Sequence, residues 1–264
     1  MPKAFSTEDI CHYQTVSHLD FSPNAAFAVC TVQSTDLDDD KTESAIWALP
    51  LDGGEPHQFS AGAGRDRAPR WSPDGSTIAF TSSRSGSPQI YLLSRDGGEA
   101  RQLSHFASGA SSAQWSPDGR YLLVICTLPV DPEKRGASGR DVDPCNERKD
   151  GPKLCWRLPY KLDGVGFTLD AESHLFKLDA NTGEHVRLTH GAVDVRSAAW
   201  SPDSRRVAFV QTREGRLANR TDIWVMDADG THARQLTDSV AVVQSPSWSP
   251  DGNYLVFSGS EDEG

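Results

Sequence analysis

Short apolar runs separated by turn residues recur along the chain. Runs rich in β-branched and aromatic side chains occur at residues 78–80, 122–124, 207–209 and 255–257. Second runs of the same kind, each followed by a turn with glycine, lie at residues 46–47, 90–92, 175–176 and 223–225. Runs of this length between turns are typical of β-strands, and patterns of helical period are nearly absent. The chain is therefore predicted to be all-β.

The five-residue string Trp-Ser-Pro-Asp-Gly recurs with these strands. It occurs at residues 71–75, 115–119 and 248–252, and residues 200–204 carry serine in place of the glycine. Residues 21–24, Phe-Ser-Pro-Asn, form a degenerate first copy, and the copies start 50, 44, 85 and 48 residues apart. Three intervals match the roughly 40–50 residues of a propeller blade, and the long one fits a blade with an insertion of about 40 residues.

The chemistry of the string explains its shape. Proline cannot donate to a β-ladder, so it ends a strand. Asp-Gly supplies the left-handed backbone of a tight hairpin turn. The tryptophan suits the packing between adjacent sheets. We therefore expect the four motif tryptophans to be largely buried between blades: Trp71, Trp115, Trp200 and Trp248.

The repeats predict a β-propeller of four-stranded antiparallel blades. The expected blades span residues 16–60, 67–104, 111–190 and 196–237, with a half-blade at 244–258. A β-sandwich is the weaker interpretation, because sandwich strands do not repeat a five-residue string at blade spacing. Four and a half blades leave open sheet edges, so residues 1–264 are expected to form an incomplete propeller. Either a second polypeptide completes it, or the chain is part of a longer protein, which we favour.

Residues 127–173 are predicted to be an insertion between the second and third strands of the third blade. Its first half is polar and charged, whereas its second half mixes aromatic, cationic and glycine residues. Long loops in compact domains are often functional. Arginine offers a bidentate fork of donors and tyrosine a rigid apolar face with a polar tip, which suits a binding loop. The candidate substrate-binding residues are Arg157, Tyr160, Lys161 and Asp163. The alternative is a purely structural hairpin in which Arg157 and Asp163 pair with each other.

Composition and charge narrow the function classes. Hydrophobic residues make up 37% and charged residues 24% of the chain, which suits a globular protein rather than a disordered one. A net charge of −11 repels phosphate backbones, so nucleic acid is not an expected partner. No apolar run approaches the roughly 20 residues that span a bilayer, and the first ten residues lack the apolar core of a secretory signal. We therefore expect a cytoplasmic protein with no membrane partner.

Sequence motifs for catalysis and for metal binding are missing. The chain has no GxSxG, HExxH, Walker A or GxGxxG string. Its five cysteines lack CxxC spacing, which argues against a disulfide framework or a zinc site. The acidic residues 36–40 lack the glycine and glutamate of a calcium loop. We expect no catalytic residue, no metal and no cofactor in these residues, which leaves open whether the parent protein is an enzyme.

The repeated string, with Ile-Ala-Phe-Thr-Ser at 78–82 and Ile-Tyr-Leu at 90–92, resembles the propeller repeats of two families. One is the prolyl oligopeptidase family of serine peptidases, and the other is the periplasmic Tol-system propeller. The missing signal sequence counts against the second. Leu-Pro-Tyr-Lys-Leu-Asp-Gly at residues 158–164, with residues 174–176 and 182–183 after it, is similar to an insertion of bacterial acylaminoacyl-peptidases.

The resemblance to acylaminoacyl-peptidases implies a seven-bladed N-terminal propeller that caps a C-terminal α/β-hydrolase domain with a Ser-Asp-His triad. The propeller of such a serine peptidase gates the access of short, often N-acylated peptides. The resemblance also implies that the candidate residues of the insertion face the peptide, with Arg157 suited to hold its carboxylate. About four and a half of those seven blades are present, the hydrolase domain is absent from this chain, and no triad residue can be assigned. The expected partners are short peptides and the hydrolase domain, and homo-oligomer formation is left open. The alternative is a non-enzymatic Tol-system-like propeller that binds protein partners.

Overall fold

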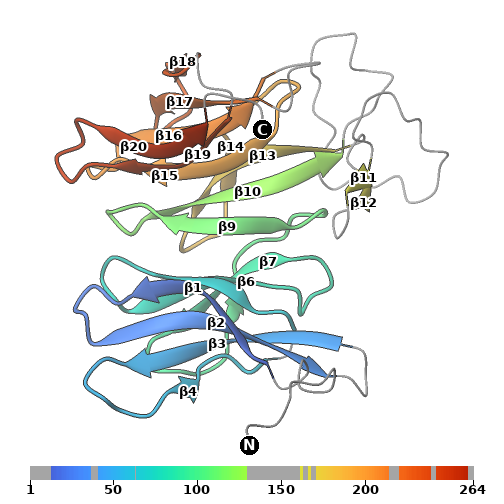
Figure 1. Ribbon diagram of the computed structural model, residues 1–264, viewed down its shortest axis with the longest axis vertical. Helices are drawn as coiled ribbons and strands as arrows, with labels where there is room; N and C mark the ends of the chain where they lie inside the picture. Colours follow the sequence, from blue (N-terminus) through green and yellow to red (C-terminus); the bar gives the residue numbers. More distant parts are fainter. Residues whose placement is uncertain are drawn as a thin grey trace, which may run out of the picture. The chain divides into compact units, whose positions relative to one another are not determined.

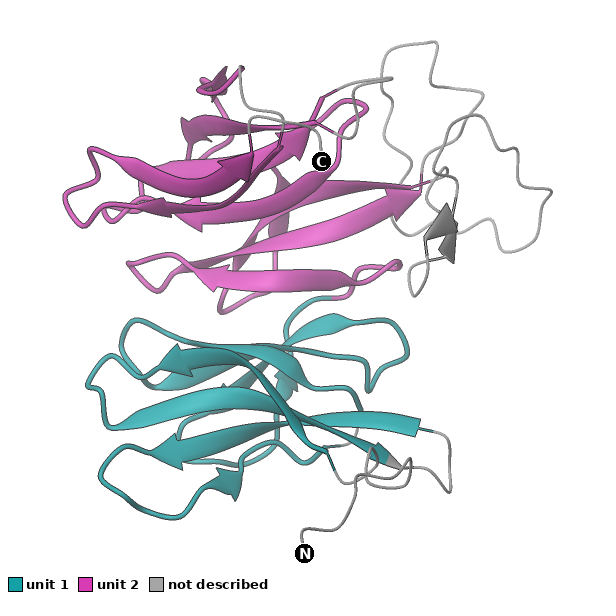
Figure 2. Ribbon diagram, in the orientation of Figure 1, with its two compact units in different colours: residues 1–104 teal, residues 105–264 magenta. Residues whose placement is uncertain are grey.

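The described part of the chain consists of β-strands and turns. The computed structural model describes residues 13–36, 41–62, 64–129, 161–162, 166–167, 171–213, 220–238 and 242–260. None of these residues lies in an α-helix. They belong to two compact units, residues 1–104 and residues 105–264 (Figure 2).

Unit 1 contains two four-stranded antiparallel sheets (Figure 1). Sheet 1 has the order β1 (Thr15–Phe21), β2 (Phe27–Asp36), β3 (Lys41–Pro50) and β4 (His57–Gln58). Sheet 2 has the order β5 (Arg67–Trp71), β6 (Thr77–Ser82), β7 (Gln89–Ser94) and β8 (Arg101–Gln102). Strands that follow each other in the sequence pair with each other, so each repeat forms one sheet.

Unit 2 contains two further four-stranded antiparallel sheets, one two-stranded sheet and a small separate hairpin. Sheet 3 consists of β9 (Ala110–Trp115), β10 (Tyr121–Pro129), β13 (Ala171–Asp179) and β14 (His185–Arg187). Sheet 4 consists of β15 (Val195–Trp200), β16 (Arg206–Thr212), β17 (Thr221–Asp227) and β18 (Arg234–Gln235). Sheet 5 has two strands, β19 (Val242–Trp248) and β20 (Leu255–Ser260), and the hairpin pairs β11 (Lys161–Leu162) with β12 (Gly166–Phe167).

These sheets confirm the predicted fold class, an all-β arrangement of four-stranded antiparallel blades. The number of blades in a complete ring stays a prediction. One boundary differs from the prediction, because β10 and β13 keep pairing as far as Pro129 and Ala171. Three residues at each end of the expected insertion, 127–129 and 171–173, are therefore strand residues.

The Trp-Ser-Pro-Asp-Gly string builds the turn between the first and second strands of a sheet. In sheet 2 the Ser72 hydroxyl donates to the Asp74 carboxylate at 2.6 Å and accepts the Thr77 amide at 3.0 Å. The Asp74 carboxylate also accepts the Ser76 amide at 3.0 Å. The same three hydrogen bonds recur in sheets 3, 4 and 5. The string therefore makes a turn that satisfies its own polar groups, which explains its repetition.

The last position of the string has a left-handed backbone. Gly75 has a φ of 68°, and the equivalent residues that depart from glycine, Ala25 and Ser204, have φ values of 52° and 59°. A side chain in this conformation costs roughly 1–2 kcal/mol. Sheets 1 and 4 therefore carry backbone strain that the glycine of the other sheets avoids.

A hydroxyl follows the fourth strand of every four-stranded sheet. Ser60 Oγ accepts the Ile46 amide at 3.0 Å, and Ser104 Oγ accepts the Ile90 amide at 2.8 Å. Thr189 and Thr237 make the equivalent bonds in sheets 3 and 4. These bonds give the Leu-Ser and Leu-Thr endings of the repeats a structural role.

Adjacent sheets pack face to face within each unit. The core between sheets 1 and 2 includes Val29, Ile46, Trp71, Ile78 and Phe80. The core between sheets 3 and 4 includes Leu123, Leu175, Trp200, Val207 and Phe209. In both cores the motif tryptophan comes from the sheet that is later in the sequence, so it packs backward onto the preceding sheet.

The motif tryptophans were all predicted to be largely buried, and none of the four is exposed, but they differ in depth. Trp71 and Trp200 are 7% and 8% exposed, whereas Trp115 and Trp248 are half-buried. Trp248 belongs to a sheet with two described strands, so fewer side chains cover it.

Candidate functional site

Most of the predicted substrate-binding residues lie outside the described residues. This applies to Arg157, Tyr160 and Asp163. Lys161 is in β11, where its backbone pairs with Phe167, and its side chain is not among those described. Their substrate-binding role therefore stays a prediction, as does the structural pairing of Arg157 with Asp163.

The strands that lead into and out of the predicted insertion are well defined. β10 and β13 each have nine residues, compared with six in β6 and β7 of sheet 2. Their last pairs are Thr127 with Ser173, Leu128 with Glu172 and Pro129 with Ala171. The longer strands extend sheet 3 at the end where the insertion begins and hold its two ends on neighbouring strands.

A buried polar cluster lies directly below this extension. The His174 side chain is 1% exposed, and its Nδ1 lies 3.2 Å from the Thr189 hydroxyl. Its Nε2 lies 3.5 Å from Glu172 Oε2, which is beyond the usual length of a hydrogen bond, so the buried Nε2 makes no hydrogen bond with the described residues. Glu172 and His174 are two residues apart, so they share one face of β13.

Cys126 adds a thiol to the same cluster, since it is directly opposite His174 in the β10–β13 pairing. Burial raises the pKa of Cys126 to about 12, against a smaller lowering by the charge of Arg187. A nucleophilic cysteine has to be a thiolate at working pH. Cys126 is therefore a protonated core residue, and the cluster supports the base of the insertion rather than forming a catalytic pair.

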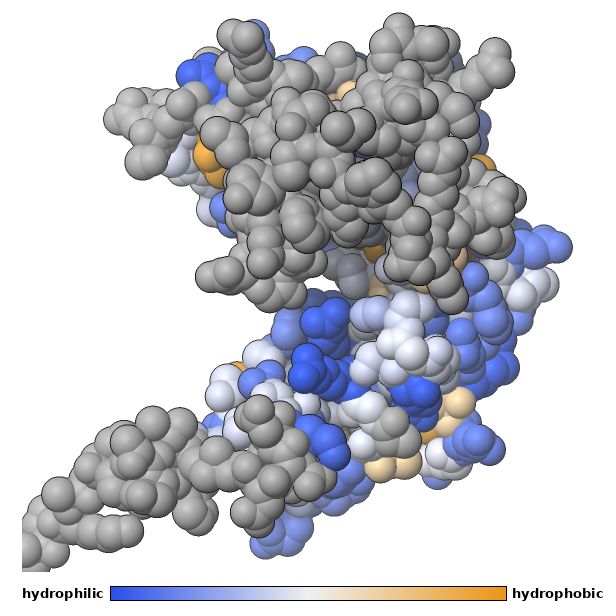
Figure 3. All heavy atoms as spheres, turned by 90° about the vertical axis from the view of Figure 1, so that its right-hand side faces the viewer, coloured by the Kyte–Doolittle hydropathy of each residue, from blue (hydrophilic) through white to orange (hydrophobic). Residues whose placement is uncertain are grey.

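Buried ion pairs occupy the same end of other sheets, where the second strand leads to the third. Arg84 Nη2 lies 2.8 Å from the fully buried Asp66 carboxylate, and its guanidinium lies 4.8 Å from the Tyr91 ring centroid. In sheet 4, Arg213 Nε lies 2.6 Å from the Asp222 carboxylate. Removing one partner of such an ion pair leaves a buried unpaired charge, so these pairs fix the ends of the loops. In contrast to these buried charges, most of the charged and polar side chains are outside, and the described surface of unit 1 seen in Figure 3 is mostly hydrophilic.

Positive charge gathers on the first strands of unit 1, although the protein is acidic. Burial, and then the charges of Arg70 and Arg67, lower the pKa of His18. β1 is joined to β5 at this point, because the Trp71 amide donates to Asp20 Oδ2 at 2.8 Å. His18 is therefore neutral at pH 7, and the local positive potential comes from the two arginines.

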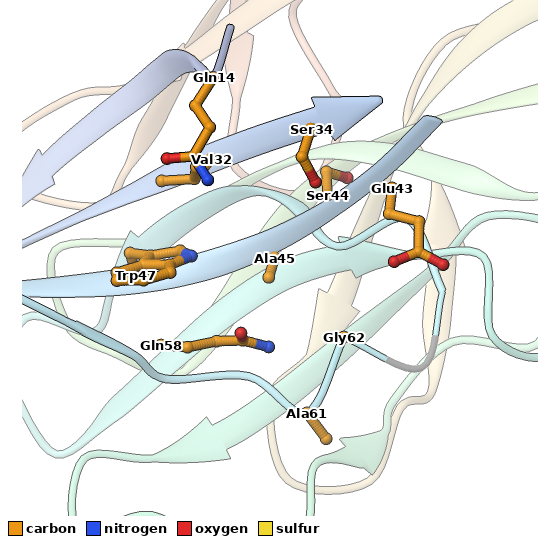
Figure 4. A pocket seen from close by; sticks show the side chains of 10 residues that line it. All are labelled: Gln14, Val32, Ser34, Glu43, Ser44, Ala45, Trp47, Gln58, Ala61 and Gly62. Carbon is orange, nitrogen blue, oxygen red and sulfur yellow. The ribbon is translucent and has the colours of Figure 1, made fainter. Parts of the chain in front are cut away.

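A hollow of about 240 Å³ opens on sheet 1 (Figure 4). Its lining includes Trp47, Glu43 and Gln58, with smaller side chains such as Ala45 around them. Trp47 and Tyr91 occupy equivalent positions in sheets 1 and 2. Trp47 pairs with Cys30 and Tyr91 pairs with Phe80, and Cys30 and Phe80 each lie nine residues after the first residue of their motif copy.

The repeat register shows what kind of surface this hollow is. Tyr91 is 4% exposed, and Gln89, the equivalent of Ala45, is 3% exposed. The corresponding residues of sheet 1, Trp47 and Ala45, are only half-buried. In sheet 2, the side chains at the equivalent positions are covered by sheet 1, the preceding sheet. The hollow is an uncovered packing face, and its geometry does not require a small ligand.

Two classes of feature are absent from the residues that the structure describes. These residues contain no group of three or more histidine, cysteine, aspartate or glutamate side chains that could hold a metal ion. They also contain no helix long and apolar enough to cross a membrane. Cys30 and Cys126 are free and buried thiols.

The comparison with known protein families agrees with the repeat pattern of the sequence. Residues 41–136 match the Tricorn protease N-terminal beta propeller domain, and residues 165–264 match the TolB beta propeller domain. The chain thus has a β-propeller fold, and its two matched regions are similar to the Tricorn and TolB propeller domains. The two matched regions contain sheets 2 to 5 and part of sheet 1, so the match supports the propeller interpretation of both units.

Individual relatives include peptidases. The chain is 32% identical over 210 residues to the uncharacterized peptidase YuxL of Bacillus subtilis, a match that covers 79% of this chain and 31% of that protein. This propeller thus spans about a third of the length of that relative. Acylaminoacyl peptidase of Pyrococcus horikoshii has a similar fold, with a TM-score of 0.63, 18% identity, and coverage of 88% of this chain and 34% of that one.

TolB-like structures are equally similar in fold. A putative TolB from Agrobacterium tumefaciens matches with a TM-score of 0.62 and 20% identity, over 95% of this chain and 72% of that one. Structural similarity at this level of identity shows the shared propeller fold and does not separate the peptidases from the Tol-type proteins.

Proposed function

We propose that this propeller is the substrate-gating part of a serine peptidase that resembles acylaminoacyl-peptidase and hydrolyses short, often N-acylated peptides. The observation that carries the proposal is the 32% identity to a peptidase along 79% of the chain. Catalytic residues would come from a hydrolase domain elsewhere in the protein. The propeller's contribution is to limit by size which peptides reach that domain.

The experiment compares the 264-residue chain with the full-length protein that contains it. We expect the chain alone to leave acetyl-alanine p-nitroanilide unchanged, and the full-length protein to cleave it and to react with a fluorophosphonate serine reagent. A series of N-acetylated peptides of increasing length tests gating, because cleavage should stop as the peptide grows. Full-length protein that neither reacts with the reagent nor cleaves any of the peptides contradicts the proposal.

The insertion supplies the second test. In the full-length enzyme, Arg157→Ala should lower kcat/KM for short peptides about tenfold if the guanidinium holds the peptide carboxylate. Lys134→Ala, in the polar first half of the insertion, is the matched control and should leave kcat/KM unchanged. Equal kinetics for both variants and the natural enzyme would assign the insertion a structural role only.

A Tol-system-like propeller that binds protein partners is the second candidate. The observation in its favour is that the chain covers 72% of a TolB-like structure but only about a third of the peptidases. Its expected signature is a stable complex with a protein partner and no reaction of the full-length protein with the fluorophosphonate.

A further inference from the structure

Two arginines share one face of the first strand of sheet 2. Arg67 pairs with Thr81 and Arg70 pairs with Ala79, so three steps along β5 match two steps along β6. Ala68, in the β-bulge between the two arginines, has a φ of 52°. Residues three apart on a regular strand point to opposite faces, but a bulge shifts the alternation by one residue. Arg67 and Arg70 therefore point to the same side of the sheet.

The bulge belongs to the repeat, whereas the charge belongs to sheet 2. The first strands of sheets 1, 3 and 5 have a bulge at the same distance before the motif. The residues equivalent to the two arginines are polar or acidic there: Ser17 and Asp20, Ser111 and Gln114, and Gln244 and Ser247. Sheet 4 has one arginine at these positions, Arg196, together with Ala199. Among the described sheets, sheet 2 alone places two cations at this bulge.

The carboxylates near the two arginines already have partners. Asp66, next to Arg67 in the sequence, is fully buried and accepts two hydrogen bonds from Arg84, at 2.8 and 3.0 Å. The Asp20 carboxylate accepts a backbone amide of β5 at 2.8 Å and interacts with the charge of Arg70. No carboxylate of the described residues forms an ion pair with Arg67, which is exposed. Arg67 thus presents an uncompensated guanidinium to solvent, beside the half-buried Arg70.

The two guanidinium groups act together on His18, an exposed residue of the neighbouring strand β1. Burial lowers the pKa of His18, and the charges of Arg70 and Arg67 lower it further. A neutral imidazole adds no charge and keeps its hydrogen-bonding nitrogens, of which Nδ1 lies 2.9 Å from the Ser17 hydroxyl. The surface between β1 and β5 therefore combines two cations with a neutral polar ring, in a protein whose net charge is −11.

We propose that Arg67 and Arg70 form a binding site for a carboxylate group of a peptide, with His18 beside it. The planar fork of a guanidinium matches the two oxygens of a carboxylate, and two forks on one face can hold one such group. That the carboxylate belongs to a peptide rests on the proposed function. A C-terminal carboxylate and an acidic side chain offer the same group, and the experiment separates these two sources.

The experiment is an NMR titration of the ¹⁵N-labelled 264-residue chain with three peptides. Acetyl-Ala-Ala-Ala has a free C-terminal carboxylate, its C-terminal amide has none, and acetyl-Ala-Asp-Ala-amide has only a side-chain carboxylate. The backbone amides of Ala68 and Trp71, which lie beside the two arginines in β5, report binding at the site. We expect these two signals to shift with a carboxylate peptide and to stay in place with the fully amidated one.

Three variants test the arginine fork. Arg67→Gln should weaken binding of the carboxylate peptide at least about tenfold, because a charged hydrogen-bonding partner is lost. Arg67→Lys keeps the charge but loses the fork, so it should weaken binding by a smaller factor. Arg196→Gln is the matched control, since Arg196 has the same register position, is exposed and lies 3.9 Å from Asp194 Oδ2. Binding should also raise the pKa of His18, because the bound carboxylate offsets the charges of the arginines.

Three outcomes overturn the proposal. Equal shifts with the acid and amide peptides would mean that the carboxylate is not recognised. Equal losses of affinity in Arg67→Gln and Arg196→Gln would make the effect one of net charge. Tighter binding of inorganic phosphate than of either carboxylate peptide would make the ligand a phosphate. The titration measures binding by this chain alone and shows from the spectrum that each variant is folded, so its result does not depend on whether the full-length protein is a peptidase.

Discussion

Replacing Trp200 with alanine should be among the most damaging single changes to unit 2. The side chain is 8% exposed, packs in the core between sheets 3 and 4, and donates its indole N–H to Gln114. Truncating a buried tryptophan to alanine costs about 3–5 kcal/mol, and the lost hydrogen bond contributes about 1 kcal/mol of that. Trp200→Phe keeps most of the apolar contact, so it should cost about 1–2 kcal/mol.

The matched control is Trp115→Ala, at the same position of the preceding repeat. Trp115 is half-buried, so the loss there should be about half as large. The free energies of unfolding come from guanidinium chloride titrations followed by circular dichroism in the amide region, where the β-sheet backbone dominates the signal, rather than by the fluorescence of the seven tryptophans. Equal losses for Trp200→Ala and Trp115→Ala, or a loss below about 1 kcal/mol for Trp200→Ala, would refute the assignment of Trp200 to the core.

Three further experiments test local features. Ala25→Gly should stabilise unit 1 by about 1 kcal/mol because glycine relieves the strain of a φ of 52°. Gly75→Ala should destabilise unit 1 by a similar amount, because it introduces the same strain. Melting temperatures that shift in the same direction for the two variants would contradict the strain argument. Hydrogen bonds from the Ser201 hydroxyl and the Arg205 amide lower the pKa of Asp203 below 3.8, so the folded protein binds fewer protons than the unfolded chain. This stabilisation is present above about pH 4 and is lost as the pH falls through the folded pKa, so urea titrations over this range should show a weaker pH dependence for Asp203→Asn. Cys126, with its pKa of about 12, should resist iodoacetamide at about pH 8 until the protein unfolds, and fast alkylation of the native protein would show that the thiol is accessible.

The sequence was sufficient to predict the fold because each repeat carries its own turn chemistry. Ser72, Asp74 and Gly75 fix one turn through local hydrogen bonds and one left-handed residue, so the string alone indicates where a hairpin forms. The difference in burial between Trp71 and Trp200 on one side and Trp115 and Trp248 on the other was not predicted. Burial depends on neighbouring sheets, and a local motif carries no information about which neighbours are present.

The candidate site was harder to predict than the fold. The cluster around His174 was missed because its members come from three strands: Cys126 lies opposite it on β10, and Thr189 follows β14. One local signal was available, since Glu172 and His174 are polar residues at alternate positions of β13, on a face that is otherwise apolar. Pairing across strands decides the rest, and the sequence pattern does not specify it.

The backward direction of the tryptophan contacts has a consequence for synthesis on the ribosome. Chains emerge from their N-terminal end, and domains fold as they emerge. When Trp200 or Trp248 leaves the exit tunnel, the carbonyl group and apolar face that it binds belong to residues already made. Sheets 4 and 5 can therefore pack as they are synthesised, because the sheet that each of them contacts has already left the ribosome.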